Sequence, residues 1–326
     1  MQIFTNANYN FIRWRWHAIA MSALIVVAGI AVMATRGLPL GIDFTGGTAL
    51  VVKFDTNPTE EQVRGAIAPI AGDKVVQQYG DAANREWLIR LPMIQGAEEG
   101  ASLEQAALRV EQLLRESGLP RFEISQRDLV GPVIGEDLQR RGIYATLASI
   151  LAITIYIGFR FRFSFAVGAI AATFHDILVT VAFLAFFGYD LSLNVVAALL
   201  TITGYSVNDT IVIFDRVREN LKALRRESLE HVVNLSVNQT LSRTIITAGT
   251  TFLSVLALFI FGGEALRGFA FTMLVGIVSG TYSTIFIASS IAIILSQRKR
   301  RHAAVPATGE APAGQQGRKQ RRARAS

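Results

Sequence analysis

Six long apolar runs constrain this chain more than any other feature of its sequence. They cover His17–Thr35 and residues 142–159, 164–187, 191–214, 245–262 and 269–295. Each approaches the roughly 20 residues that a helix needs to cross the hydrocarbon of a bilayer. Only helices and closed barrels satisfy their own backbone hydrogen bonds there, so we expect six transmembrane helices. The hydrophobic fraction of 51% agrees, because it is too high for a water-soluble chain of 326 residues.

The first run could instead be a secretory signal peptide. Its apolar core is longer than the usual hydrophobic region of a signal, and Arg36–Pro39 offers no cleavage site between small residues. We therefore interpret residues 1–35 as an N-terminal segment followed by the first transmembrane helix.

The positions of Lys and Arg predict the orientation. The short loops Gly188–Asp190 and Gly262–Gly268 hold only Arg267, whereas the opposite ends of the runs are rich in basic residues: Arg13, Arg15, Arg160, Arg162, Arg216, Arg218, Lys222, Arg225 and Arg226. Basic loops stay in the cytoplasm. Both termini should therefore be cytoplasmic, and residues 36–141 should lie outside the cell membrane.

The excess positive charge lies at the C-terminus. The whole chain carries +7, and residues 298–326 account for all of it. Pro, Ala, Gly and Gln separate the basic clusters there, which predicts a disordered cytoplasmic tail that is attracted to anionic lipid. A contact with a ribosome or another partner is the alternative. Because the charge is confined to this tail, we do not expect nucleic acid to be a partner.

Residues 36–141 alternate between strand and helix patterns. They predict strand Thr48–Phe54, helix Thr59–Ile70, strands Lys74–Tyr79 and Glu86–Leu91 joined by a turn at Gly80-Asp81, helix Ser102–Ser117 and strand Phe122–Gln126. Thr59 with Gln62 is a capping box, and Ser102 with Gln105 repeats the pattern. Gly118 should end the second helix. The β-α-β-β-α-β order is that of a ferredoxin-like α+β fold, which hosts many functions. With neither a nucleophile–base pair nor a metal cluster in it, we do not expect catalysis.

A glycine-rich segment precedes this domain. Gly41, Asp43, Gly46 and Gly47 belong to it, and its glycines suggest backbone conformations or close contacts that a Cβ would prevent. A phosphate-binding loop is the alternative, but the Lys-Ser/Thr of a P-loop is missing and no helix follows directly. We interpret the segment as a structured connector between helix and domain.

Charged residues within the apolar runs are the main functional signal. Asp176 lies near the middle of the third run, Asp209 lies in the fourth, and Arg243 begins the fifth. A charge at the bilayer centre costs about 2.5–3.5 kcal/mol on insertion scales, so such residues usually mark ion or proton pathways.

Polar residues beside these charges form stripes at helical spacing: Asn194, Thr201, Tyr205 and Asn208 on the fourth run, and Arg243, Thr247, Thr250 and Ser254 on the fifth. Lipid cannot satisfy such groups, so these faces should turn toward other helices or a wet cavity. Small residues in the last run (Gly276, Ser279, Gly280, Ser283) are interpreted as packing residues. Residues 216–242 should form an amphipathic cytoplasmic connector helix at the membrane surface.

Asp209 and Arg243 are predicted to pair. Asp209 lies roughly 9 Å inside the cytoplasmic boundary of its helix, and Arg243 enters from the same side. A carboxylate that gains and loses an Arg partner changes its proton affinity, which a proton-coupled cycle requires. Alternatively, Arg243 reaches lipid headgroups and Asp209 lies in water. His175 and Asp176 form a second candidate relay, with a packing role as the alternative.

These residues resemble a known family: SecF, the smaller membrane subunit of the SecDF complex, in the resistance–nodulation–division superfamily. The resemblance covers residues 12–297 and is carried by Gly41–Gly47, His175–Asp176, Gly204–Asn220 and Gln239–Thr244. It implies five transmembrane helices over 142–297 after the outer domain.

The resemblance also implies partners and an energy source. Members of the family pair with SecD, associate with the SecYEG channel and YajC, and use the proton gradient, without a cofactor, to draw exported polypeptides across the bacterial inner membrane. Asp209 and Arg243 match the family's intramembrane proton-transport pair, with Asn208, Asp176 and His175 as neighbours. The alternatives are a structural subunit without its own proton pathway, or a stand-alone exporter.

Overall fold

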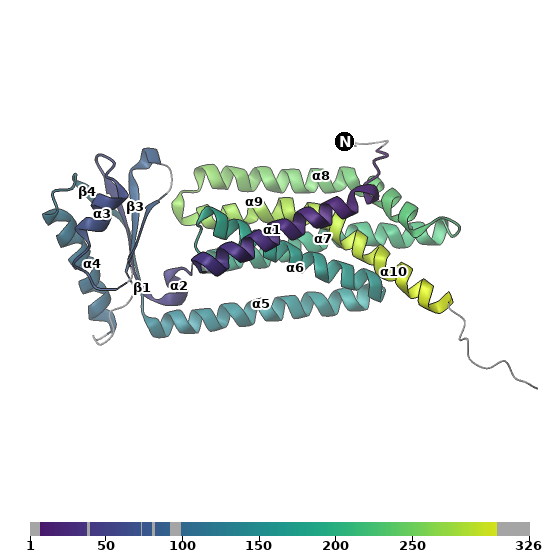
Figure 1. Ribbon diagram of the computed structural model, residues 1–326, viewed down its shortest axis with the longest axis horizontal. Coiled ribbons are helices and arrows are strands. Elements are labelled where there is room, and N and C mark those ends of the chain that lie inside the picture. The colour runs from purple at the N-terminus through teal and green to yellow at the C-terminus, as the bar shows by residue number, and fades with distance from the viewer. Residues whose placement is uncertain (1–6, 38–39, 73, 80–81, 92–98, 305–326) are drawn as a thin grey trace, which may run out of the picture.

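The computed structural model describes residues 7–37, 40–72, 74–79, 82–91 and 99–304. It consists of a helical bundle with a small α+β domain at one end (Figure 1). We call that end of the bundle the domain end and the opposite end the distal end. Helix α1 begins and helix α10 ends on the distal side (Figure 1).

The six predicted membrane-spanning helices are confirmed in the described residues. The first follows a short turn, η1 (Ile12–Trp14), and the sixth is interrupted by one π-helical turn, η3. The elements are α1 (Arg15–Arg36), α5 (Pro132–Arg160), α6 (Phe163–Phe187), α7 (Leu193–Ala223), α8 (Leu229–Phe261), α9 (Glu264–Ser283), η3 (Thr284–Ala288) and α10 (Ser289–Ala304).

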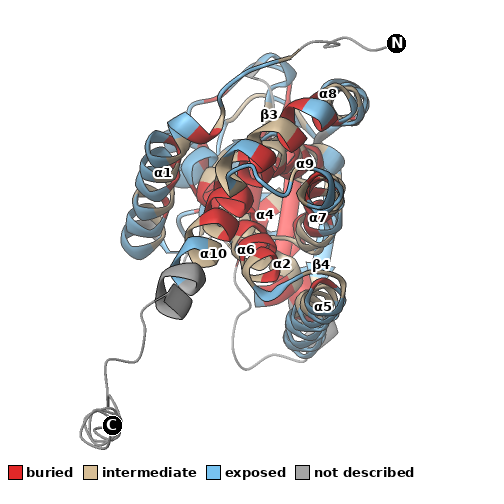
Figure 2. Ribbon diagram, turned by 90° about the vertical axis from the view of Figure 1, so that its right-hand side faces the viewer, coloured by how far each residue is buried: buried red, intermediate tan, exposed pale blue. Residues whose placement is uncertain are grey.

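Helices α6, α7 and α9 form the centre of the bundle, and α1 and α5 flank it with largely exposed surfaces (Figure 2). Small residues permit the close contacts. A Cβ on Gly168 of α6 would lie 2.5 Å from the carbonyl oxygen of Ala288 in η3, and one on Gly276 of α9 would lie 2.2 Å from Ile202 of α7. The packing role predicted for Gly276 therefore agrees with the structure.

The α+β domain has the predicted ferredoxin-like order. Its elements are β1 (Gly47–Phe54), α3 (Glu60–Ala66), β2 (Val75–Tyr79), η2 (Ala82–Asn84), β3 (Glu86–Leu91), α4 (Glu99–Glu116) and β4 (Phe122–Val130). The antiparallel sheet has the order β2-β3-β1-β4. Helices α3 and α4 cover the face away from the bundle (Figure 1), where Val52, Ile67, Ile89 and Val110 form a fully buried core. The other face looks toward the bundle.

The structure confirms some of the predicted helix ends and contradicts others. The capping box is confirmed: the hydroxyl of Thr59 accepts a hydrogen bond from the Gln62 amide, and the Gln62 side chain accepts one from the Thr59 amide. Gly118 follows α4 with φ of +71°. Ser102 does not start α4, because the helix already begins at Glu99. The predicted turn at Gly80-Asp81 lies outside the described residues.

The cytoplasmic connector prediction is wrong. Residues 216–242 do not form one helix, because α7 continues to Ala223 and α8 begins at Leu229. The apolar residues that suggested an amphipathic surface helix pack between these two helix ends, where Val232 and Val233 are fully buried. The side-chain amide of Asn220 donates hydrogen bonds to the Ser236 hydroxyl (2.9 Å) and the Gln239 side-chain oxygen (2.8 Å) across the hairpin.

Two further boundaries differ. Helix α5 begins at Pro132, inside the segment 36–141 assigned to the outer domain. Helix α10 continues to Ala304, so the tail predicted to be disordered from residue 298 is helical at its start. Residues 305–326 lie outside the described residues.

Candidate functional site

Asp209 is buried in α7 with an incompletely bonded carboxylate. It is 5% exposed, and its Oδ2 atom has no hydrogen-bond partner among the described residues. Arg243 is exposed and lies on α8, which packs against α7. No direct ion pair joins the two in the part of the chain that the structure describes. The predicted partners are therefore brought near each other but not into contact.

Two more buried polar atoms lie close to this pair in the sequence. The Tyr205 hydroxyl, one turn before Asp209, and the Thr244 hydroxyl, next to Arg243, lack hydrogen-bond partners within the described ranges. Most buried polar groups are hydrogen-bonded. Helices α7 and α8 thus hold buried polar groups with unused bonding capacity near Asp209 and Arg243 in the sequence.

The two predicted polar stripes do not face the interior of this chain's bundle. On α7, Asn194, Thr201 and Asn208 are exposed, whereas Tyr205 of the same stripe is half-buried and its hydroxyl is buried. On α8 the whole stripe is exposed, comprising Arg243, Thr247, Thr250 and Ser254. The hydroxyls of this stripe are satisfied within α8, since Thr247 donates to the Arg243 carbonyl and Ser254 to the Thr250 carbonyl. Each helix therefore presents a polar face to its surroundings.

Asp176 lies in a cage of hydrogen-bond donors between α6, α7 and α9. It is 1% exposed. Its Oδ2 accepts hydrogen bonds from Ser206 (2.6 Å) and Ser283 (2.8 Å), and its Oδ1 accepts one from Ser279 (2.7 Å). The Nδ1 atom of His175 lies 3.1 Å from the same Oδ1. A carboxylate bonded in this way holds three helices together.

The serines of this cage are functional groups that sequence reasoning missed. Ser279 and Ser283 were interpreted as packing residues, and that interpretation is wrong because both donate to Asp176. Their spacing of one helical turn was the available signal. Gly280 between them does serve packing, since a Cβ there would lie 2.9 Å from the Ser206 side chain.

His175 connects the cage to α1. Its ring stacks on Tyr282, with centroids 6.2 Å apart, and the Tyr282 hydroxyl donates a 2.7 Å hydrogen bond to the Ala18 carbonyl. The Nε2 atom of His175 is buried without a partner among the described residues. Further along the bundle, the hydroxyls of Thr210 and Thr284 are 2.9 Å apart. Thr210 is next to Asp209 in the sequence, and Thr284 is next to Ser283, which bonds to Asp176. Buried hydroxyls therefore lie near both Asp209 and Asp176.

The glycine-rich segment packs closely against the start of α7 and connects it to the domain. It contains a one-turn helix, α2 (Ile42–Thr45), which the sequence did not predict. The Gly41 amide donates to the Leu191 carbonyl (2.8 Å), and Asp43 Oδ2 accepts from the Leu193 amide at the start of α7 (2.9 Å). Gly46 and Gly47 have φ of +68° and +124°, which side-chain-bearing residues rarely adopt.

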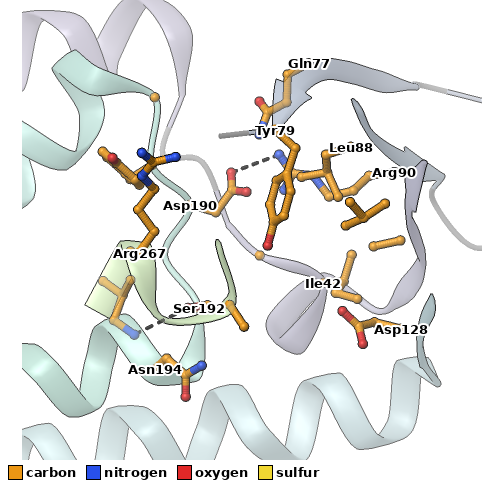
Figure 3. A pocket seen from close by; sticks show the side chains of 18 of the residues that line it. Ile42, Gln77, Tyr79, Leu88, Arg90, Asp128, Asp190, Ser192, Asn194 and Arg267 are labelled. Carbon is orange, nitrogen blue, oxygen red and sulfur yellow. Dashed lines mark hydrogen bonds and ion pairs between the residues drawn. The ribbon is translucent and has the colours of Figure 1, made fainter. Parts of the chain in front are cut away.

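A cleft of about 720 Å³ lies between the sheet and the domain end of the bundle (Figure 3). Arg90 of β3 and Asp190 of the α6–α7 loop meet across it with a separation of 2.8 Å. Arg90 also donates to the Leu40 carbonyl. Burial raises the pKa of the Asp190 carboxyl above its ordinary value of 3.8, and the Arg90 charge opposes that increase.

Six membrane-spanning helices, buried carboxylates and an attached α+β domain define a multi-pass membrane protein of the transport class. Among the described residues, no group of three His, Cys, Asp or Glu side chains could hold a metal ion. The family described as protein export membrane protein SecD/SecF, C-terminal, matches residues 109–298, and the SecD/SecF GG motif matches residues 31–58. The chain belongs to the SecF family of protein translocase subunits.

Similar proteins cover most of the chain. The protein translocase subunit SecF of Rhodothermus marinus is 43% identical, with 91% of this chain and 96% of that protein aligned. The SecF of Escherichia coli O157:H7 is 37% identical, with 90% of each aligned. The crystal structure of SecDF, a translocon-associated membrane protein from Thermus thermophilus, superposes with a TM-score of 0.81 at 36% identity. It covers 91% of this chain, which spans 40% of that SecDF chain.

Proposed function

We propose that this chain is the proton-coupled half of a SecD–SecF complex that assists polypeptide export through the SecYEG channel, together with YajC. The complex would lie in the bacterial inner membrane, with the α+β domain in the periplasm. The proton gradient would supply the energy without a cofactor. This chain spans only 40% of the similar SecDF chain. We infer that a separate SecD partner corresponds to the other part of that SecDF chain.

The observation that carries this proposal is the state of Asp209. A buried carboxylate with one unbonded oxygen, near an arginine that it does not touch, can exchange a proton when the helices shift. An opposite charge at close range favours the ionised acid, and separation from it favours the protonated acid. Alternating between these two arrangements would couple proton movement to a change of conformation.

The exposed polar faces of α7 and α8 support a SecD partner. In hydrocarbon, groups such as Asn208 and Arg243 need polar neighbours, and both are exposed, with neither making a side-chain hydrogen bond or ion pair within the described part of the chain. Helices of a second subunit would cover both faces. The proton pathway would then run between the subunits, beside Asp209.

The distribution of basic residues supports cytoplasmic termini. Arg15, Arg160 and Arg216 belong to helix ends at the distal end of the bundle. Positive charges beside helix ends favour the cytoplasmic side. The α+β domain, at the opposite end, would then face the periplasm.

Asp209→Asn tests the proposal. Proteoliposomes that contain the variant with SecD and the Sec channel should lose proton flux and gradient-driven export, while co-purification with SecD is unchanged. Asp137→Asn, on the exposed surface of α5, is the matched control and should export normally. Normal export by Asp209→Asn would disprove the proton role.

The second candidate function is that of a structural subunit. The exposed polar faces are the observation that favours it, because they could serve only to hold SecD. In that case Asp209→Asn should lose co-purification with SecD, and export should fall in proportion. A stand-alone exporter would instead be active in vesicles without any partner.

A further inference from the structure

Three polar contacts among the described residues connect the α+β domain and its glycine-rich segment to the start of α7. Gly41 bonds to Leu191, Asp43 bonds to the amide of Leu193, and Arg90 pairs with Asp190 (Figure 3 shows the last). All three bundle residues lie in the loop that leads into α7 or in its first turn. These contacts therefore join the domain to the start of the helix that carries Asp209, in addition to the direct chain connection from β4 into α5.

Asp43 completes the N-terminus of α7 from outside that helix. The first four amides of a helix have no partner within it. Ser192 satisfies the Val195 amide from the N-cap position, and the Asp43 carboxylate satisfies the Leu193 amide. A negative charge at this end also interacts favourably with the helix dipole. Asp43 thus supplies to α7 both an acceptor and a charge.

Close backbone contact makes this attachment specific. A Cβ on Gly41 would lie 3.1 Å from the Leu191 carbonyl oxygen and 3.4 Å from the backbone of Ser192. A larger residue would push the segment away from the loop and lengthen the Asp43 bond. Gly135 of α5 contacts the other side, where a Cβ would lie 3.0 Å from the Gly46 amide. The segment is held between α5 and the start of α7.

Helix α7 can carry a displacement from this attachment to Asp209. It runs without interruption from Leu193 to Ala223 and contains no proline. At 1.5 Å per residue, Asp209 lies about 24 Å from the attached end. A shift of α7 along its axis at Asp209 would therefore also displace Leu193, whose amide is bonded to Asp43.

We propose that Asp43 is a positioning residue which, with the Arg90–Asp190 pair, makes the α+β domain follow the movements of α7. The movement of the domain rests on the proposed function, because binding or release of a proton at Asp209 is what would move α7. The attachment itself does not depend on that function and can be measured separately.

Spin-label distances test the attachment. The natural chain has no cysteine, so Glu104→Cys on α4 and Thr201→Cys on α7 can be labelled specifically in the purified full-length protein. The distance distribution should be narrow in the parent and several-fold broader after Asp43→Ala. Asp43→Asn, whose amide oxygen still accepts a hydrogen bond, should restore the narrow distribution. Asp128→Ala removes a carboxylate of the same cleft that is bonded to Gln126, and should leave the width unchanged.

Gradient-driven export tests the coupling. In unlabelled proteoliposomes with the full complex, Asp43→Ala should lower export several-fold, and Asp43→Asn and Asp128→Ala should retain it. A narrow distribution in Asp43→Ala, equal broadening in Asp43→Asn, or normal export despite broadening would each overturn the inference. If Asp43→Ala does not accumulate, Arg90→Gln tests the same attachment with the same expectation. Normal export by Asp209→Asn would refute the proposed function but would leave the distance result standing.

Discussion

The hydroxyl of Ser206 on α7 donates a 2.6 Å hydrogen bond to the Asp176 carboxylate on α6. Both groups are almost fully buried, at 2% and 1% exposure. Ser279 and Ser283 of α9 complete the contacts, so one acid organises three central helices.

Removal of one cage hydroxyl should destabilise the bundle. Ser206→Ala leaves a buried carboxylate oxygen short of a donor, which costs about 1–3 kcal/mol. Ser254→Ala is the control, because Ser254 is exposed and donates to its own helix. Melting of the purified protein in detergent should show a lower transition temperature for Ser206→Ala only. Equal transitions in the two variants would contradict the importance of the cage.

The Arg90–Asp190 pair should respond unequally to loss of its two members. The side chains are only 13% and 20% exposed. Arg90→Gln leaves a largely buried carboxylate without its counter-charge and should cost about 1–3 kcal/mol. Asp190→Asn should cost less, because the amide oxygen still accepts a hydrogen bond and Arg90 keeps its bond to the Leu40 carbonyl. Trp87 fluorescence reports unfolding of the domain once Trp14 and Trp16 are replaced by Phe. Equal losses would argue against burial as the cause.

Asp190 should also make stability depend on pH. Its pKa is raised by burial above the ordinary 3.8, with Arg90 opposing the increase, so the folded chain holds this proton more tightly than the unfolded chain. The resulting stabilisation is fully present below the unfolded pKa and is lost as pH rises through the raised folded pKa. Asp190→Asn cannot ionise, so its stability relative to the parent should increase as pH rises through that range. Parallel pH profiles from melting experiments would exclude the effect.

Gly168 should not tolerate a side chain. A Cβ there would lie 2.5 Å from the Ala288 carbonyl oxygen, so Gly168→Ala forces α6 away from η3 and should cost about 1–3 kcal/mol. Gly158→Ala on α5 meets no atom within 4 Å and serves as the control. Yield and melting temperature should fall for Gly168→Ala alone; a drop in Gly158→Ala as well would indicate a general effect of losing glycine.

The exposed polar face of α8 should contact SecD. A photo-crosslinking amino acid at Thr247 or Thr250 should form an adduct with co-expressed SecD. The same group at Leu151, which is 59% exposed on α5, is the control and should form none. Adducts at Leu151 but not on α8 would place the interface elsewhere.

The spanning helices and the order of strands and helices along the α+β domain could be predicted because both follow from local patterns. Long apolar runs require helices, and the strand and helix periods between 48 and 126 specify the α+β order. The capping box at Thr59 succeeded for the same reason, since all its partners lie within one turn.

Contacts between distant segments could not be predicted. The Asp43–Leu193 bond joins residues 150 positions apart, and a glycine-rich segment alone does not indicate which helix it meets. Serine in an apolar helix is equally compatible with close packing and with hydrogen bonding, so Ser279 and Ser283 were assigned to the wrong role. The hairpin at residues 224–228 was missed because apolar residues that pack between two helices have the same spacing as those of a surface helix.

The π-helical turn η3 changes the phase of the sixth span. Its wider turn accommodates an additional residue, and the side-chain hydroxyl of Ser289 donates to the Thr284 carbonyl five positions earlier. One additional residue rotates everything that follows by about 100°. Ser279 and Ser283, before the turn, point to Asp176, while Ala288 at the end of the turn and Ala292 after it lie against Gly168. The sixth span thereby turns a hydroxyl-lined face toward α6 at one depth and an apolar face toward α6 at another. An uninterrupted α-helix of the same residues could not turn both faces toward α6.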